Sequence, residues 1–190
     1  MRISIILFLL LVLYGCSGRQ DTGLKAPAKP RQLGAVIFNA LKTGDFTKAS
    51  PYFINAADID FFFARKLKKL SKNRPRNEKQ IAQTEKNRRN ATKAFPSLRR
   101  QRLQLTNKGF NDLRAKLAKE GLSWKQARYT GMHMENTHYK YGIPYADLLI
   151  TITTQGNNFV VRIPACARFE RGWIFSEIPR WEGKAKNRTK

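Results

Sequence analysis

The spacing of apolar residues changes at Trp124, and this change constrains the fold more than any other feature of the sequence. Before Trp124, apolar side chains recur every three or four residues, which is the spacing of one face of a helix. After Trp124 they alternate with polar side chains, as in strands that bury one face. Helices followed by hairpin-connected strands favour an α+β domain with helices on one face of an antiparallel sheet. The sequence therefore predicts this fold for residues 33–183.

The helical part begins at residues 33–41, where apolar side chains recur at helical spacing. Gly44 is placed to end this helix, and Asp45 is placed to cap a second, short helix. A third helix is expected from about Asp58. Its Phe61-Phe62-Phe63 triplet could form an aromatic platform for bases, but two of the three rings lie on the apolar stripe, so we expect core packing.

Residues 73–77 interrupt the helical pattern, and Pro96 is expected to break it again. Between them, residues 78–95 permit a helix but contain few apolar side chains. This segment is therefore either a solvated helix or partly disordered. Residues 103–117 form a further helix face that ends at Gly121.

Two alternating segments, residues 146–153 and 159–168, indicate strands of a meander that starts near Trp124. Residues 155–158, with the sequence Gln-Gly-Asn-Asn, are typical of a hairpin turn between them. Pro164 cannot donate to a strand ladder, so it predicts a bulge or an edge. A last strand is expected around residues 173–178 after a turn.

The usual signatures of catalysis and metal binding are absent from the sequence, so we predict no catalytic residue, no metal site and no cofactor. His133 lies between Met132 and Met134, which suggests a Cu(I) site, but alternation along a strand would turn His133 away from both methionines. Cys166 is expected to be an inert residue of the sheet. Three acids, Asp58, Asp60 and Asp147, are best explained by helix capping and by strand-surface roles.

The formal net charge is +24, and most of the excess lies in residues 65–120, which hold nineteen Lys and Arg against four acids. Such a charge points to an anionic partner and says nothing about the fold. A solvated basic face with no specific partner is the alternative. Eight basic residues are the candidate contacts: Arg65, Lys66, Lys68, Lys69, Arg88, Arg89, Arg99 and Arg100.

The first seventeen residues have the layout of an export signal, with Arg2 at the start and an apolar run from Ile5 to Leu13. The run is too short to cross a bilayer, which needs about 20 residues. Leu13, Gly15 and Cys16 resemble the lipobox of bacterial lipoproteins. This resemblance implies cleavage before Cys16, acyl chains on that cysteine and, with Ser17 next, sorting to the outer membrane, facing the periplasm.

The expected organisation follows from these patterns. A signal peptide covers residues 1–15, and a flexible tether rich in glycine and proline covers residues 16–32. The α+β domain spans residues 33–183 and includes the basic helical segment at 65–120. A basic tail covers residues 184–190.

Two short motifs resemble domains like nuclear transport factor 2, which have a cystatin-like fold. The first is Phe38-x-Ala40-Leu41-Lys42-x-Gly44-Asp45-Phe46-x-x-Ala49, and the second is Arg171-Gly172-Trp173-Ile174-Phe175. The resemblance spans residues 33–181 and implies a curved sheet wrapped by helices, forming a cone with a pocket. Enzymatic members place His, Asp or Tyr in the cone, but no such set can be matched here by position.

The sequence therefore favours a lipid-anchored envelope protein that acts as a non-catalytic binding or scaffolding module. Its expected partners are the membrane, through Cys16, and anionic lipid, lipopolysaccharide or wall polymer, through the basic segment. One alternative is a ligand-binding or enzymatic pocket lined by His133, Asp147 and Tyr129 or Tyr141. Nucleic-acid binding is the other, and the expected location disfavours it.

Overall fold

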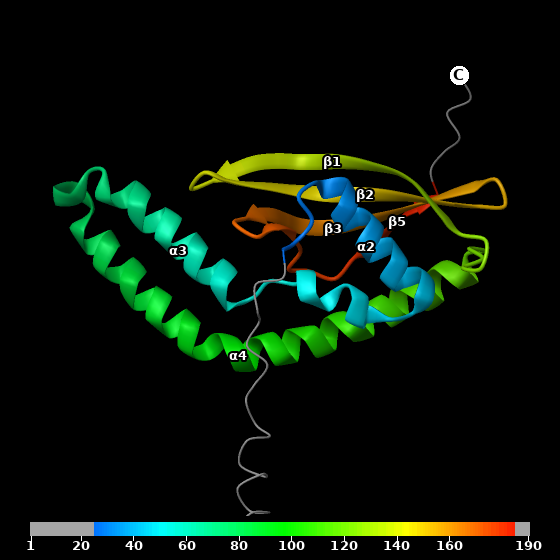
Figure 1. Ribbon diagram of the computed structural model, residues 1–190, viewed down its shortest axis with the longest axis horizontal. Helices are drawn as coiled ribbons and strands as arrows, with labels where there is room; N and C mark the ends of the chain where they lie inside the picture. The colour runs from blue at the N-terminus through cyan, green and yellow to red at the C-terminus, as the bar shows by residue number, and fades with distance from the viewer. Residues whose placement is uncertain (1–24, 185–190) are drawn as a thin grey trace, which may run out of the picture.

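The computed structural model describes residues 25–184, and within them it confirms the α+β class: helices come first and an antiparallel five-stranded sheet follows (Figure 1). The elements are α2 (Pro30–Thr43), η1 (Phe46–Lys48), η2 (Ser50–Tyr52), α3 (Ala56–Ser71), α4 (Arg74–Lys119), β1 (Arg128–Lys140), β2 (Ile143–Thr154), β3 (Asn157–Phe169), β4 (Gly172–Ile174) and β5 (Arg180–Lys184).

Three long strands form a meander in the order β1-β2-β3, and the short β4 and β5 pair with opposite ends of β3. Two-residue turns with positive φ join the long strands, Tyr141-Gly142 between β1 and β2 and Gln155-Gly156 between β2 and β3. Such turns match the twist of the strands they join. The predicted hairpin turn at residues 155–158 is confirmed.

The predicted irregularity at Pro164 is a β-bulge. Ala146 pairs with Cys166 and Leu148 pairs with Ile163, so Asp147 alone lies opposite both Pro164 and Ala165. Ala165 has a φ of +50°, and its N–H donates to Asp147 Oδ1 at 3.0 Å. The Asp147 carboxylate thus accepts the N–H of Ala165, a residue that the bulge leaves without a partner in the strand ladder.

The main core lies between the sheet, α2 and the second half of α4. Leu33, Ile37 and Leu41 of α2 are buried, as the period of residues 33–41 predicts. Leu117 of α4 and Ile150 of β2 are also fully buried in the same cluster. The apolar faces predicted from the sequence therefore meet in one core.

The first half of α4 packs against α3, and together they extend away from the sheet (Figure 1). We call α3 and residues 74–100 of α4 the helical arm. Thr84 is buried, the Asn77 side-chain amide donates to the Leu70 carbonyl at 2.9 Å, and the stripe residues Phe62 and Phe63 are half-buried. The arm is thus a helical hairpin with little apolar core of its own.

The predicted break at Pro96 is wrong, because α4 is one helix of 46 residues with Pro96 inside it. Proline removes one N–H donor and crowds the preceding turn, which bends a helix. Figure 1 shows that α4 is bent, so its two halves follow α3 and the sheet in turn. The carbonyl that lacks its helical donor belongs to Thr92, which is exposed, so water can bind it.

The predicted start of the domain at residue 33 is also wrong, because the last part of the expected tether belongs to the fold. Ala26 is buried, and its N–H donates to the Arg171 carbonyl at 2.7 Å. The Trp173 N–H donates to the Pro27 carbonyl at 2.8 Å, and α2 begins at Pro30. The predicted signal peptide, Cys16 and the tail after Lys184 lie outside the described residues.

Candidate functional site

The helical arm carries a large excess of positive charge. Residues 56–100 contain fourteen Lys and Arg and four acids, a net charge of +10. Two of the four acids are neutralised, since Asp58 pairs with Arg171 at 2.7 Å and Asp60 pairs with Arg88 at 3.0 Å. The arm is therefore the part of the molecule best suited to an anionic partner.

The eight predicted contact residues all lie on the arm, and the structure gives them different roles. Arg88 pairs with Asp60 across the hairpin, and Arg99 Nε donates to the Ile54 carbonyl at 3.3 Å. Arg88 thus holds α4 against α3, and Arg99 holds α4 against the chain that leads into α3. Lys66 and Arg99 are half-buried, and six of the eight are exposed: Arg65, Lys68, Lys69, Arg88, Arg89 and Arg100.

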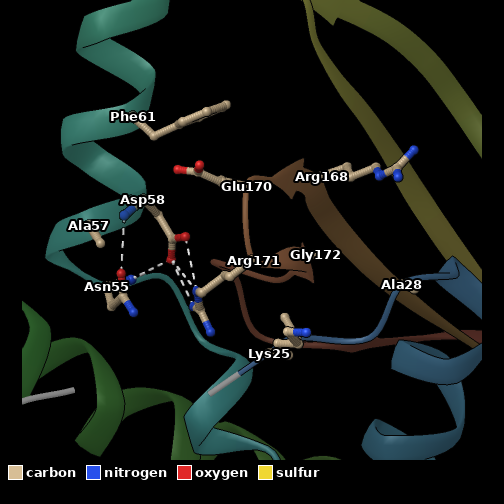
Figure 2. Close-up of a pocket in the computed structure, with 11 residues that line it drawn as sticks. Lys25, Ala28, Asn55, Ala57, Asp58, Phe61, Arg168, Glu170, Arg171 and Gly172 are labelled. Carbon is tan, nitrogen blue, oxygen red and sulfur yellow. Dashed lines mark hydrogen bonds and ion pairs between the residues drawn. The ribbon is translucent and has the colours of Figure 1, made fainter. Parts of the chain in front are cut away.

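The base of the arm is fixed by three polar side chains, Asn55, Asp58 and Arg171, which we call the arm clamp (Figure 2). Asn55 Oδ1 accepts from the Asp58 N–H at 3.0 Å, and Asp58 Oδ2 accepts from the Asn55 N–H at 2.9 Å. This reciprocal capping box fixes the first turn of α3. The function of Asp58 in capping, predicted from the sequence, is confirmed.

Arg171 completes the clamp from the β3–β4 turn. Its Nη1 donates to the Pro51 carbonyl and its Nη2 to the Phe53 carbonyl, each at 2.9 Å. The Asp58 side chain is 2% exposed and that of Arg171 is 12% exposed. Because these buried polar groups bind one another, the clamp is a rigid joint between arm and sheet.

A hollow of about 490 Å³ lies beside the clamp (Figure 2). Exposed Lys25, Arg168 and Glu170 line it, together with the half-buried ring of Phe61. No fully buried side-chain nitrogen or oxygen of the clamp lacks a hydrogen-bond partner in the described part of the chain. Lys25, the first described residue, therefore lies at the foot of the arm.

A second charged cluster lies on the sheet around Arg162. Its guanidinium binds Glu182 at 2.8 Å, Glu135 at 2.9 Å and Asp147 at 3.0 Å. The Glu182 hydrogen bond is the largest of the effects that raise the pKa of Arg162. Partial burial alone would raise the pKa of Asp147, but hydrogen bonds from Asn136, the Ala165 N–H and Arg162 lower it overall. This network supports the bulge.

The side chains considered for a metal or an enzymatic pocket do not converge. Met132 and Met134 pair with Ile150 and Leu148, whereas His133 pairs with Leu149 and turns the other way. Within residues 25–184, no three His, Cys, Asp or Glu side chains are grouped as a metal site would require.

The proposed pocket set is separated in the same way. The Tyr129 hydroxyl donates to the Arg31 carbonyl, Tyr141 contacts the Phe62 ring, and Asp147 binds Arg162. Cys166 is fully buried, and its burial raises the pKa of the thiol well above the ordinary range. It is therefore inert at neutral pH.

Sequence reasoning missed two features of the arm, the clamp at its base and the contact of α3 with the β1–β2 hairpin. The clamp joins residues 113 positions apart, a separation that no local pattern reveals. Its local half, Asn55-x-x-Asp58, is a capping motif that could have placed the start of α3 at Ala56.

Comparison with models of protein families, with curated proteins and with solved structures gives no match in any of the three. In the described part of the chain, no helix combines the length and the apolar character needed to cross a bilayer.

Proposed function

We propose that this protein is a lipid-anchored protein of the bacterial cell envelope, and that its helical arm binds an anionic membrane or envelope polymer without catalysing a reaction. The observation that carries the proposal is the net charge of +10 on an arm whose foot lies at Lys25. Lipidation of Cys16 rests on the likeness of its surroundings to a lipobox. The proposed location is the outer membrane, facing the periplasm.

The distance along the chain supports this arrangement. Lys25 is nine residues after Cys16, so a fully extended chain spans about 30 Å between them. The sixteen residues of α3 extend about 24 Å from the same foot. An acyl anchor on Cys16 would therefore keep the foot of the arm within about 30 Å of the membrane surface, which leaves the arm free to reach that surface. Each Lys or Arg brought near an anionic leaflet contributes about 1 kcal/mol to binding.

Lipidation is tested by replacing the thiol. Cys16→Ala should accumulate as the unprocessed precursor, because acylation requires the sulfur atom. The wild-type chain should partition into the detergent phase of a detergent separation. Normal cleavage of the variant, together with a wild-type chain in the aqueous phase, would rule out this part of the proposal.

The role of the arm is tested with two matched triple variants of the chain from Lys25 onward. The arm triple is K79Q/K86Q/K93Q, and the far-end triple is K119Q/K125Q/R128Q at the other end of α4 and the start of β1. All six side chains are exposed, and each triple removes three charges. Circular dichroism first establishes that both variants fold like the parent chain.

The arm triple should weaken binding to anionic vesicles at least tenfold, and the far-end triple should have a much smaller effect. Binding of the parent chain should fall steeply between low salt and 0.5 M salt, and neutral vesicles should not bind it. Equal losses from the two triples would mean that only the total charge matters. Equal binding to anionic and neutral vesicles would refute the role of the arm.

A further inference from the structure

Three lysines gather on two aromatic rings where α3 passes the tip of the β1–β2 hairpin. Lys66 Nζ lies 5.9 Å and Lys69 Nζ 6.0 Å from the centre of the Tyr141 ring. Lys140 Nζ lies 5.7 Å from the centre of the Phe62 ring, and the two rings meet edge to face at 5.4 Å. We call these five residues the lysine–aromatic patch.

The fold holds the patch in place from both sides. Phe62, Lys66 and Lys69 are spaced four and three residues apart, so they share one face of α3. Lys140 ends β1, and Tyr141 has a φ of +54° in the tight turn that follows. The arm clamp fixes α3 at its other end. The patch is therefore a preformed arrangement of two rigid elements.

The three ammonium groups have no carboxylate partner among the described residues. This differs from Arg162, which binds three carboxylates, and from Arg171, which binds Asp58. The aromatic faces attract the ammonium groups only weakly, so the three positive charges lack a strong partner in the described part of the chain. An anion that approaches these lysines would supply the missing countercharge.

We propose that the lysine–aromatic patch binds the phosphate groups of an anionic phospholipid bilayer and thereby sets the orientation of the arm on the membrane. This inference rests on the proposed function and adds to it the face that meets the lipid. Lysine binds phosphate as a compact point charge. Aromatic rings beside lysines suit the region of a bilayer where headgroups meet acyl chains.

The rings favour a lipid surface over a nucleic acid. Binding of single-stranded nucleic acid uses aromatic rings on which bases stack. Here two ammonium groups already lie over the Tyr141 ring, and a third lies over the Phe62 ring. The Phe62 ring also meets Phe63 edge to face at 5.6 Å. The patch therefore offers cations rather than stacking surfaces.

The test uses the full chain, reconstituted into anionic vesicles and separately into neutral ones, and measures hydrogen–deuterium exchange. The amides of residues 139–142 should exchange at least threefold more slowly in anionic vesicles. Residues 155–158, at the tip of the other hairpin, serve as the internal control and should exchange equally in both. Equal exchange at residues 139–142 in the two vesicle types would overturn the inference.

Matched variants separate the patch from general attraction. K66Q/K69Q/K140Q should abolish the difference in amide exchange between anionic and neutral vesicles at residues 139–142. The arm triple removes the same charge and should retain most of that difference. Equal losses in the two variants would overturn the inference. If residues 74–93 were protected in anionic vesicles and residues 139–142 were not, the proposed function would stand and the inference would fail. Lack of protection in both segments would refute both.

Two further probes in neutral vesicles identify the source of the phosphate. Glycerol phosphate and duplex DNA are added separately, and residues 139–142 are measured again. Weak or no protection by either compound supports a bilayer as the partner. Protection by glycerol phosphate as strong as that in anionic vesicles would show a site for a soluble phosphate ester. Stronger protection by DNA would show a nucleic-acid site, and either result would overturn the inference.

Discussion

Arg171 donates hydrogen bonds to both carboxylate oxygens of Asp58, at distances from 2.7 to 3.2 Å, while Asp58 also caps the first turn of α3. One side chain from the β3–β4 turn thus fixes the direction in which the arm leaves the sheet. The basic surface of the arm and the core of the sheet are coupled through this pair.

The first prediction concerns this pair. Arg171→Met leaves the Asp58 carboxylate buried without its partner, and removing one member of a buried ion pair costs about 3–5 kcal/mol. For a domain of this size the melting temperature should fall by about 10 °C. Thermal unfolding followed by circular dichroism measures this change.

The control for Arg171 is Arg180→Met, which breaks an exposed pair with Glu177 and should cost about 0–1 kcal/mol. The double variant D58N/R171M should recover part of the loss, because it removes the uncompensated charge. If Arg171→Met were no more harmful than Arg180→Met, the clamp would not be an important contact.

The second prediction concerns Gly109, where α4 lies against the connection between β4 and β5. A Cβ at this position would clash with the side chain of Ile178. Gly109→Ala should therefore destabilise the domain, although alanine is the better helix former by about 1 kcal/mol. Urea unfolding measures the free energy of unfolding of the variant.

Asn90→Ala, on the exposed surface of α4, is the matched control and should be neutral or slightly stabilising. Removing the Ile178 side chain should relieve the clash. The loss in free energy of unfolding caused by Gly109→Ala should therefore be smaller in a chain that already carries Ile178→Ala than in the parent chain. A stabilising effect of Gly109→Ala alone would show that α4 and Ile178 are not in close contact.

The third prediction concerns pH. The pKa of Asp147 is lowered in the folded protein, since the bonds from Asn136, the Ala165 N–H and Arg162 outweigh the effect of burial. The ionised carboxylate therefore stabilises the fold fully above the unfolded value of about 3.9, and this contribution is lost as the pH falls through the folded pKa.

Asp147→Asn should therefore be clearly less stable than the parent at pH 7, and the difference should narrow as the pH falls below about 4. Urea unfolding of both chains at pH 7 and pH 3 gives the comparison. Asp112→Asn, at an exposed position of α4, should show no such narrowing. A difference that is independent of pH would contradict the assigned role of Asp147.

The fourth prediction concerns thiols. Burial raises the pKa of Cys166, so a thiol reagent at pH 8 should not modify it in the folded chain. If Cys16 is acylated, as we propose, the chain in denaturant should show one reactive thiol, that of Cys166. Two thiols in denaturant would argue against lipidation, and rapid reaction of Cys166 in the folded chain would contradict its burial.

The sheet could be predicted well from the sequence because its signals are local. Three signals that act within a few residues each have the expected result. They are the alternation along residues 146–153, which gives a strand, the Gln155-Gly156 turn, and Pro164, which gives a bulge. Which outward-facing residues become neighbours depends on the strand register, and a bulge changes that register. The contacts of Arg162 with its three carboxylates could therefore not be predicted.

The arm and its site could be predicted only in part. The high charge of residues 65–120 is visible in the sequence, but the contacts that select Arg88 and Arg99 for structural roles come from the packing of α3 on α4. Pro96 by itself strongly disfavours the interior of a helix, but the tertiary contacts that α4 makes before and after Pro96 override this preference. The lysine–aromatic patch combines α3 with a hairpin about seventy residues later in the chain, so no local sequence motif could predict it.

The pairing of the leading segment with β4 has a mechanical consequence. Ala26 and Pro27 each form one backbone hydrogen bond with the β4 region, and they pass so close to Gly172 that any side chain there would collide with them. A pull on the chain at Lys25 would therefore load these two bonds and the β4 edge before it reached α2. Tension from a surface attached upstream would thus be delivered to the foot of the arm, and the helix that covers the sheet would be shielded from it.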